Sequence, residues 1–149
     1  MSKEDIELAT RAIRAVAARP KPDFETMNEV FDPDHVYVPT TRAIDAEEYR
    51  GGRGYQQFLR EEGGNIGASD AALVWDEADL EGAIDVGNHK VIAVTAARFH
   101  GTGSGVEFEQ RIWVVMTVRH GRICRSESYT DPTEALKAGL SEQDTHADS

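Results

Sequence analysis

Residues 106–130 of the chain, VEFEQRIWVVMTVRHGRICRSESYT, decide the fold. In the first part of this stretch apolar side chains recur at every second position, which is the spacing of a strand with one face against a core. The pair His120-Gly121 then has the residue types of a tight hairpin turn. The stretch therefore predicts two antiparallel strands, over residues 106–119 and 122–130.

The two faces of this hairpin differ in chemistry. One face of the first strand is apolar apart from a single amide, so we expect it to point inward. Its members are Phe108, Gln110, Ile112, Val114, Met116 and Val118. On the second strand the small residues Cys124, Ser126 and Ser128 share the inner face, and Arg125, Glu127 and Tyr129 share the outer one. The small inward side chains leave room for a cavity, or for helix side chains to fill.

Two earlier segments extend the sheet. Residues 72–85 and 90–100 have the same strand character, and Gly87-Asn88 joins them. The glycine-rich residues 101–105 lead from the second segment into the strand described above. Both connections have hairpin chemistry, which predicts an antiparallel meander.

Helical spacing is found before the meander. Residues 3–19 carry apolar side chains on one helical face, and Asp23 can cap a second helix that ends before Pro33. Residues 34–39 then predict a short strand, and Tyr55 and Phe58 lie at helical spacing in a third helix.

A last helix is predicted after the meander. Asp131 caps it, Pro132 occupies its first position, and Gly139 ends it. Helices segregated from hairpins indicate a single α+β domain over residues 1–140, and the polar residues 141–149 predict a disordered tail.

Composition narrows the partners and the compartment. The net charge is −11, from 27 acidic and 16 basic residues, so we expect neither a nucleic acid nor a membrane surface as partner. The single cysteine, Cys124, excludes an internal disulfide and a thiolate metal site. The five histidines have no metal-ligand spacing, so no metal and no cofactor are expected. The chain shows no leader-like or membrane-spanning run, which predicts a cytoplasmic protein.

Several segments, taken in order, resemble SnoaL-like proteins of the nuclear transport factor two-like superfamily. Residues 49–59, YRGGRGYQQFL, are similar to the loop-into-helix motif of that family. Further similar segments are residues 31–34, 103–107, 119–123, 127–131 and 135–136. The resemblance covers residues 5–140 and implies a strongly curved antiparallel sheet wrapped around N-terminal helices, with a pocket at the wide end of this cone.

The resemblance also implies a ligand and a partner. Members bind small hydrophobic or cyclic molecules, as polyketide cyclases do, and commonly dimerise through the convex sheet face. The pocket residues that we expect here are Tyr37, Pro39, Tyr55, Phe58, Trp75, Gln110, Ile112, Val114, Met116, Ser126 and Ser128. The residues expected on the convex face of a homodimer are Arg111, Trp113, Arg125 and Tyr129.

The matching positions lack the carboxylates of two familiar enzymes. Ketosteroid isomerases need a carboxylate base, a tyrosine and a protonated acid, and the matching positions are Pro39, Ala15 and Val114. Limonene epoxide hydrolases match at Tyr37, but their final-strand aspartate corresponds to Ser128. The resemblance therefore implies a ligand site without the usual catalytic acids.

The candidates for chemistry are Tyr37, His35 and Ser128. Tyr37 could polarise a carbonyl, with His35, Gln110 or Ser128 assisting a cofactor-free isomerisation, cyclisation or dehydration. A tyrosine of the core with its hydroxyl in water is the structural alternative for Tyr37. The position of His35 at the start of a strand, next to Asp34, predicts exposure to solvent.

Two other functions stay open from the sequence. One is a non-enzymatic dimeric module whose cone is filled by its own side chains. The other is a dehydratase, which requires His35 or His100 to reach the pocket. Arg98 shares a face with His100, and we expect both to be solvated. An inward Gln110 needs a partner, either a ligand or a backbone group.

Overall fold

The computed structural model of the protein describes residues 2–18, 22–38, 49–50, 73–101, 105 and 107–140. The elements are α1 (Ser2–Ala17), α2 (Phe24–Val30), β1 (Phe31–Val38), β2 (Tyr49–Arg50), β3 (Leu73–Gly87), β4 (Lys90–Gly101), β5 (Glu107–Arg119), β6 (Arg122–Tyr129) and α5 (Pro132–Leu140). The helix predicted around Tyr55 and Phe58 and the tail at 141–149 lie outside the described residues.

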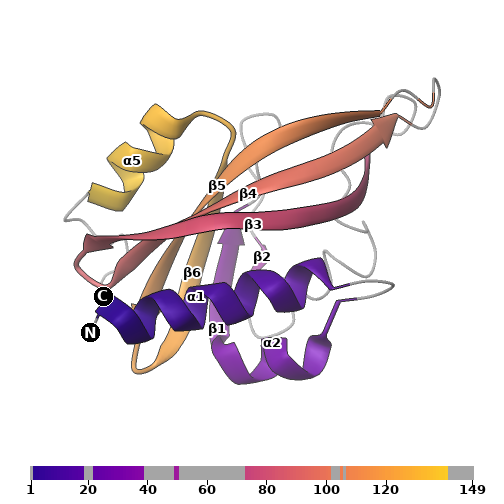
Figure 1. Ribbon diagram of the computed structural model, residues 1–149. Helices are drawn as coiled ribbons and strands as arrows, with labels where there is room; N and C mark the ends of the chain where they lie inside the picture. Colours follow the sequence, from indigo (N-terminus) through magenta and orange to yellow (C-terminus); the bar gives the residue numbers. More distant parts are fainter. Residues whose placement is uncertain are drawn as a thin grey trace.

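The strands form one sheet in the order β2-β1-β6-β5-β4-β3. Figure 1 shows this curved sheet with α1 and α2 on one face and α5 on the other. The predicted meander is confirmed, because β3, β4, β5 and β6 pair antiparallel in succession. Two pairs were not predicted: β1 runs parallel to β6, and the two-residue strand β2 pairs antiparallel with β1. The architecture is therefore the predicted α+β cone, closed by one long-range parallel contact.

Left-handed backbone makes the two tight turns. His120 and Gly121 have φ of 55° and 75°, as a two-residue hairpin turn between β5 and β6 requires. Between β3 and β4 the left-handed region extends over Gly87, Asn88 and His89, with φ of 92°, 55° and 60°. Both turns lie at the end of the sheet where α1 begins (Figure 1).

Side-chain caps fix the two predicted helix starts. The Asp23 carboxylate accepts hydrogen bonds from the Thr26 backbone N–H at 3.1 Å and from its hydroxyl at 2.8 Å, and these bonds lower the pKa of Asp23. The Asp131 carboxylate accepts from the Thr133 N–H at 2.9 Å. Both caps confirm the sequence prediction.

On β5 the inner face is buried as predicted, whereas on β6 a bulge puts Ile123 in the core in place of the predicted Cys124. Val114, Met116 and Val118 belong to one apolar cluster with α1 and α2, and Met116 is fully buried. The alternation of residues along β5 therefore predicted the core correctly.

The outer face differs from the prediction, because α5 packs on it. Val115 and Thr117 are 2% and 6% exposed. Ala135 of α5 is fully buried against Val115 and Ile92. The sequence pattern of β5 could not show that a helix beyond β6 returns over this face.

Gly139 is inside α5 and does not end it, contrary to the prediction. A Cβ atom there would lie 3.0 Å from Ile92 Cδ1 and 3.1 Å from Val86 Cγ2. The glycine thus allows the helix to approach the sheet closely. Within the described residues, no helix has the length and hydropathy needed to cross a membrane, and the cytoplasmic location stays a prediction.

Candidate functional site

The candidate site lies on the inner face where β1 meets β6. Their parallel register places Tyr37 beside Ser126. On the other side of β6, Ser126 is opposite Met116 and Ser128 is opposite Val114 in β5. Because alternate residues of a strand share a face, β6 and β1 present two serines and a tyrosine to the same side. We call these residues, with His35 and Val114, the inner wall.

His35 is buried, so the prediction of exposure is wrong. It is 2% exposed, its Nε2 lies 2.9 Å from Ser126 Oγ, and its ring centroid is 4.5 Å from that of Phe31. Burial and then the nearby charge of Arg125 lower its pKa to about 3. The imidazole is therefore neutral near pH 7, and it cannot act there as a proton donor in cationic form.

Ser126 explains why His35 is buried. It is fully buried, and its small side chain leaves space for the imidazole on the neighbouring strand. The pairing satisfies both polar groups away from water. The sequence did not predict this contact, because it depends on the long-range parallel register of β1 with β6.

Ser128 differs from Ser126 in one respect. It is 8% exposed on the inner wall, yet its hydroxyl has no hydrogen-bond partner anywhere in the part of the chain that the structure describes. A buried hydroxyl without a protein partner costs about 1–3 kcal/mol. Such groups call for a specific explanation, and one candidate is a hydrogen bond with the carbonyl or hydroxyl of a ligand.

Tyr37 is 7% exposed and lies in the apolar cluster with Val114 and Met116. Ile112 packs on the edge of this cluster and is partly buried. The aromatic ring of Tyr37 is thus part of the core, as the structural alternative proposed.

Gln110 is half-buried, and its amide Nε2 donates a hydrogen bond to the Arg111 carbonyl at 2.9 Å. A backbone group is therefore a partner for this amide. Its place in β5, opposite Ala97, is further along the strand from the turn than Val114.

Four of the predicted pocket residues cannot be placed. Pro39, Tyr55 and Phe58 lie outside the described residues, and so does the side chain of Trp75, although its backbone belongs to β3. The structure brings together the predicted members from β1, β5 and β6, and the wide end of the cone stays a prediction.

The inner wall carries no ionised side chain among its described residues. The nearest charges on β6 face the other side of the sheet, where Arg125 and Glu127 form an ion pair and the Tyr129 hydroxyl donates to Glu127 at 2.7 Å. A ligand on this wall would therefore meet neutral hydrogen-bonding groups in apolar surroundings.

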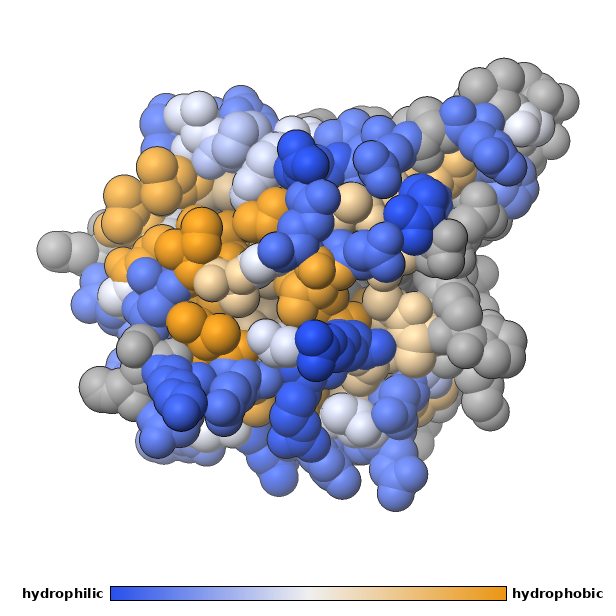
Figure 2. Space-filling model, in the orientation of Figure 1, coloured by the Kyte–Doolittle hydropathy of each residue, from blue (hydrophilic) through white to orange (hydrophobic). Residues whose placement is uncertain are grey.

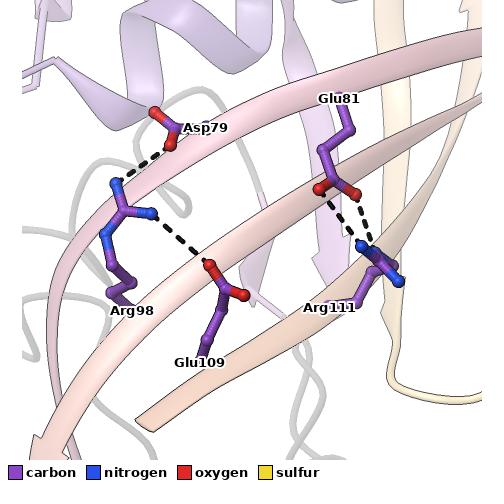
Figure 3. Close-up of polar contacts among 5 residues, drawn as sticks. All are labelled: Asp79, Glu81, Arg98, Glu109 and Arg111. Carbon is purple, nitrogen blue, oxygen red and sulfur yellow. Dashed lines mark hydrogen bonds and ion pairs between the residues drawn. The ribbon is translucent and has the colours of Figure 1, made fainter. Parts of the chain in front are cut away.

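The outer face carries several ion pairs between strands (Figure 3). Arg98 bridges Asp79 at 3.0 Å and Glu109 at 3.5 Å, and Arg111 binds both oxygens of Glu81 at 2.7 and 3.2 Å. These pairs join β3, β4 and β5. Those pairs hold the pKa of Glu81 below its usual value, chiefly through the hydrogen bond from Arg111.

His100 lies on this outer face too, opposite Glu107. It therefore does not reach the inner wall, and a dehydratase that uses His100 is not supported. With His35 held as a neutral group of the core, the histidine-dependent hypothesis loses both of its candidates as acids.

Solved structures with this arrangement of helices and sheet share its overall fold. One is an epoxide hydrolase of *M. tuberculosis* that resembles limonene epoxide hydrolase, with a TM-score of 0.61 and 19% identity over 93% of this chain and 92% of that one. The chain has the nuclear transport factor two-like fold. A candidate SnoaL-like polyketide cyclase from *Shewanella denitrificans* has a TM-score of 0.60 and 17% identity, covering 94% of this chain and 98% of its own.

A third structure has a bound molecule. It is a hypothetical protein from *Catenulispora acidiphila* with a ketosteroid isomerase-like fold in complex with trimethylamine, with a TM-score of 0.63, 13% identity and coverage of 90% and 92%. No family model and no curated protein sequence matches the chain. At these identities the similarity establishes the fold alone, and any reaction has to be argued from the residues of the site.

Proposed function

We propose that the protein binds a small, uncharged, largely apolar cyclic molecule against the inner wall. The observation that carries the proposal is the buried Ser128 hydroxyl, which lacks a protein partner in the described chain. A ligand carbonyl or hydroxyl would satisfy it, and the ring of Tyr37 and the side chain of Val114 would supply apolar contacts.

The electrostatics of the wall favour a neutral ligand. An anion or cation would lose its hydration without gaining an opposite charge, since the described wall residues carry none. The structural neighbours support a ligand-binding cone, because they include an epoxide hydrolase and a candidate polyketide cyclase.

If the protein is an enzyme, its chemistry would be a cofactor-free isomerisation, cyclisation or dehydration. Tyr37 and Ser128 would then bind the reacting carbonyl. His35 would position Ser126 and the wall without exchanging a proton, because its pKa of about 3 makes it a weak base. These roles fit binding better than acid–base catalysis, so ligand binding is the primary proposal.

A titration with the bicyclic ketone β-tetralone tests this function. We expect saturable NMR shifts of the Val114 and Met116 methyl groups, and about fivefold weaker binding in Ser128→Ala through the loss of one hydrogen bond. Tyr37→Phe should weaken binding similarly. The matched anion, naphthoate, should not bind. Equal binding of ketone and anion, or unchanged affinity in both variants, would contradict the proposal.

A dimeric module without chemistry is the second candidate. Large apolar side chains are exposed on the α5 side of the sheet: Ile84 is 55% exposed, Leu136 48% and Leu140 55%. Figure 2 shows hydrophobic side chains gathered beside α5 and along β3. Surface apolar residues of this kind often mark interfaces.

The convex-face residues expected in a homodimer already have contacts within the chain. Arg111 and Arg125 form ion pairs, and Trp113 and Tyr129 pack beside the α5 cluster. We therefore propose that the leucines of α5 contribute to any dimer. Light scattering should show the monomer mass for the double variant Leu136→Glu and Leu140→Glu and a dimer for Lys137→Glu. A monomeric wild type would exclude this candidate.

A further inference from the structure

A second concavity lies at the end of the sheet that carries the two tight turns, and no inner-wall residue lines it. Its volume is about 500 Å³, within the usual range for small-molecule sites. Figure 1 shows the start of α1 between the two turns. Three elements therefore form the walls of this concavity, which we call the turn groove: the first turn of α1, the β3–β4 turn, and the end of β5 with the turn that follows it.

Both turns carry a histidine in left-handed backbone. Asn88, His89 and His120, with φ of 55°, 60° and 55°, are the non-glycine residues with positive φ in the described chain, and all three line the turn groove. Tight hairpin turns prefer asparagine followed by glycine, because glycine adopts positive φ without strain. The sequence instead places His89 where glycine is favoured and His120 where asparagine is favoured. Backbone preference does not explain these two imidazoles, and a function of their side chains does.

Asp5 and His89 form a fixed pair in the turn groove. Asp5 Oδ2 lies 3.3 Å from His89 Nδ1, and the Asp5 side chain is only 12% exposed. The backbone also holds His89 in place, because its carbonyl accepts a hydrogen bond from the Val118 N–H at 2.8 Å. The carboxylate of Asp5 is thus anchored at the α1 side of the groove.

The charged groups of the turn groove are already engaged within the chain. A hydrogen bond with the amino terminus holds the pKa of Glu4 below its usual value. Arg119 has interactions of its own within the protein, and Asp5 lies against His89. An ionic ligand would have to displace one of these contacts, and it would meet a like charge on one of the walls. The electrostatics therefore favour a ligand without charged groups.

Hydrogen-bonding groups without a partner remain for such a ligand. Within the described residues, no hydrogen bond reaches the side-chain amide of Asn88, the imidazole of His120 or the second carboxylate oxygen, Oδ1, of Asp5. An amide presents donors and an acceptor side by side, a carboxylate oxygen accepts, and a neutral imidazole does both. Neighbouring hydroxyl groups on a saturated ring each donate and accept, so they match this set of groups.

We infer that the turn groove binds a neutral polyhydroxylated ring of the monosaccharide type. One hydroxyl would donate to Asp5 Oδ1, a neighbouring hydroxyl would bond the Asn88 amide, and His120 would bond the ring from the β5 side. This site is separate from the inner wall, so it holds or fails independently of the proposed function.

Backbone-amide NMR titrations of the full chain test the inference. The probes are methyl glucoside, methyl mannoside and methyl galactoside, because the last two each differ from the first in the orientation of one hydroxyl. The control is cyclohexanol, a saturated ring with a single hydroxyl. We expect saturable shifts at His89, Val118 and Gly121 with at least one glycoside and none with cyclohexanol. No saturable shift from any of the three glycosides, or equal binding of cyclohexanol, would overturn the inference.

Two variants locate the binding. Asn88→Gly and His120→Asn each remove a ligand-binding side chain, and each should weaken the glycoside about fivefold or more. Both new residues adopt left-handed backbone readily, so the melting temperature should not fall and lost binding cannot come from lost folding. His100→Asn is the matched control, because His100 lies on the outer face and does not line the groove. If His120→Asn binds as tightly as His100→Asn, or if the shifts map to Val114, the site is not in the turn groove.

Discussion

At the scale of single residues, two serines on one strand face have different surroundings. Ser126 is bonded to His35, whereas Ser128 has no partner in the described chain. Replacement by alanine should therefore change the free energy of unfolding by different amounts at the two positions, although both side chains are buried and have the same size.

Ser126→Ala should destabilise the protein by about 1–3 kcal/mol, because it leaves the buried imidazole of His35 unsatisfied. Ser128→Ala should be neutral or stabilise slightly, since it removes a hydroxyl that makes no bond. Urea unfolding of the ligand-free variants measures both. Equal losses would contradict the assigned difference.

His35 should make stability depend on pH. Its pKa is about 3 in the folded protein against an ordinary 6.5, so below 6.5 the unfolded chain binds a proton that the folded chain refuses. The stabilisation is complete above pH 6.5 and is lost as pH falls toward 3, at about 1.4 kcal/mol per pH unit. In His35→Gln, the free energy of unfolding should lack this part of its dependence on pH between 6.5 and 3. An NMR titration midpoint near 6.5 for His35 in the folded state would contradict it.

At the scale of elements, the docking of α5 depends on a missing side chain. Gly139→Ala favours the helix by about 1 kcal/mol, but its methyl group would crowd Ile92 and Val86. We expect a net loss of about 1 kcal/mol in thermal unfolding. Ile92→Val removes the closest methyl group. The double variant Gly139→Ala with Ile92→Val should therefore be more stable than Ile92→Val alone. Full tolerance of Gly139→Ala would mean that α5 packs less closely.

Two ion pairs on the outer face should differ in strength. The side chains of Arg125 and Glu127 are 16% and 14% exposed, whereas those of Arg111 and Glu81 are 54% and 38% exposed. Arg125→Met strands a nearly buried carboxylate and should cost about 3 kcal/mol, against less than about 1 kcal/mol for Arg111→Met. Similar losses in urea unfolding would show that Glu127 is well solvated.

At the scale of the whole molecule, local periodicity predicted most of the fold. The alternation along β5 gave the inner and outer faces, and the turn residues gave the hairpins, because both signals act over a few residues. The parallel contact of β1 with β6, and with it the burial of His35, joins positions about ninety residues apart. The return of α5 over Val115 is also a long-range contact, so neither had a local signal.

The candidate site was predictable to the same extent. Strand parity placed Ser126 and Ser128 on one face, the family resemblance added Tyr37, and the structure brings the three together. Strand parity could not distinguish the hydrogen-bonded Ser126 from the unbonded Ser128, because the difference depends on a partner from another strand.

The central claim is that the inner wall holds a small neutral molecule. Native mass spectrometry of the freshly purified protein tests it most directly, with β-tetralone added if no ligand co-purifies. We predict a complex of protein and one small molecule that is lost in Ser128→Phe, whose ring fills the wall. Bare protein under both conditions, or an equally populated complex in Ser128→Phe, would contradict the claim.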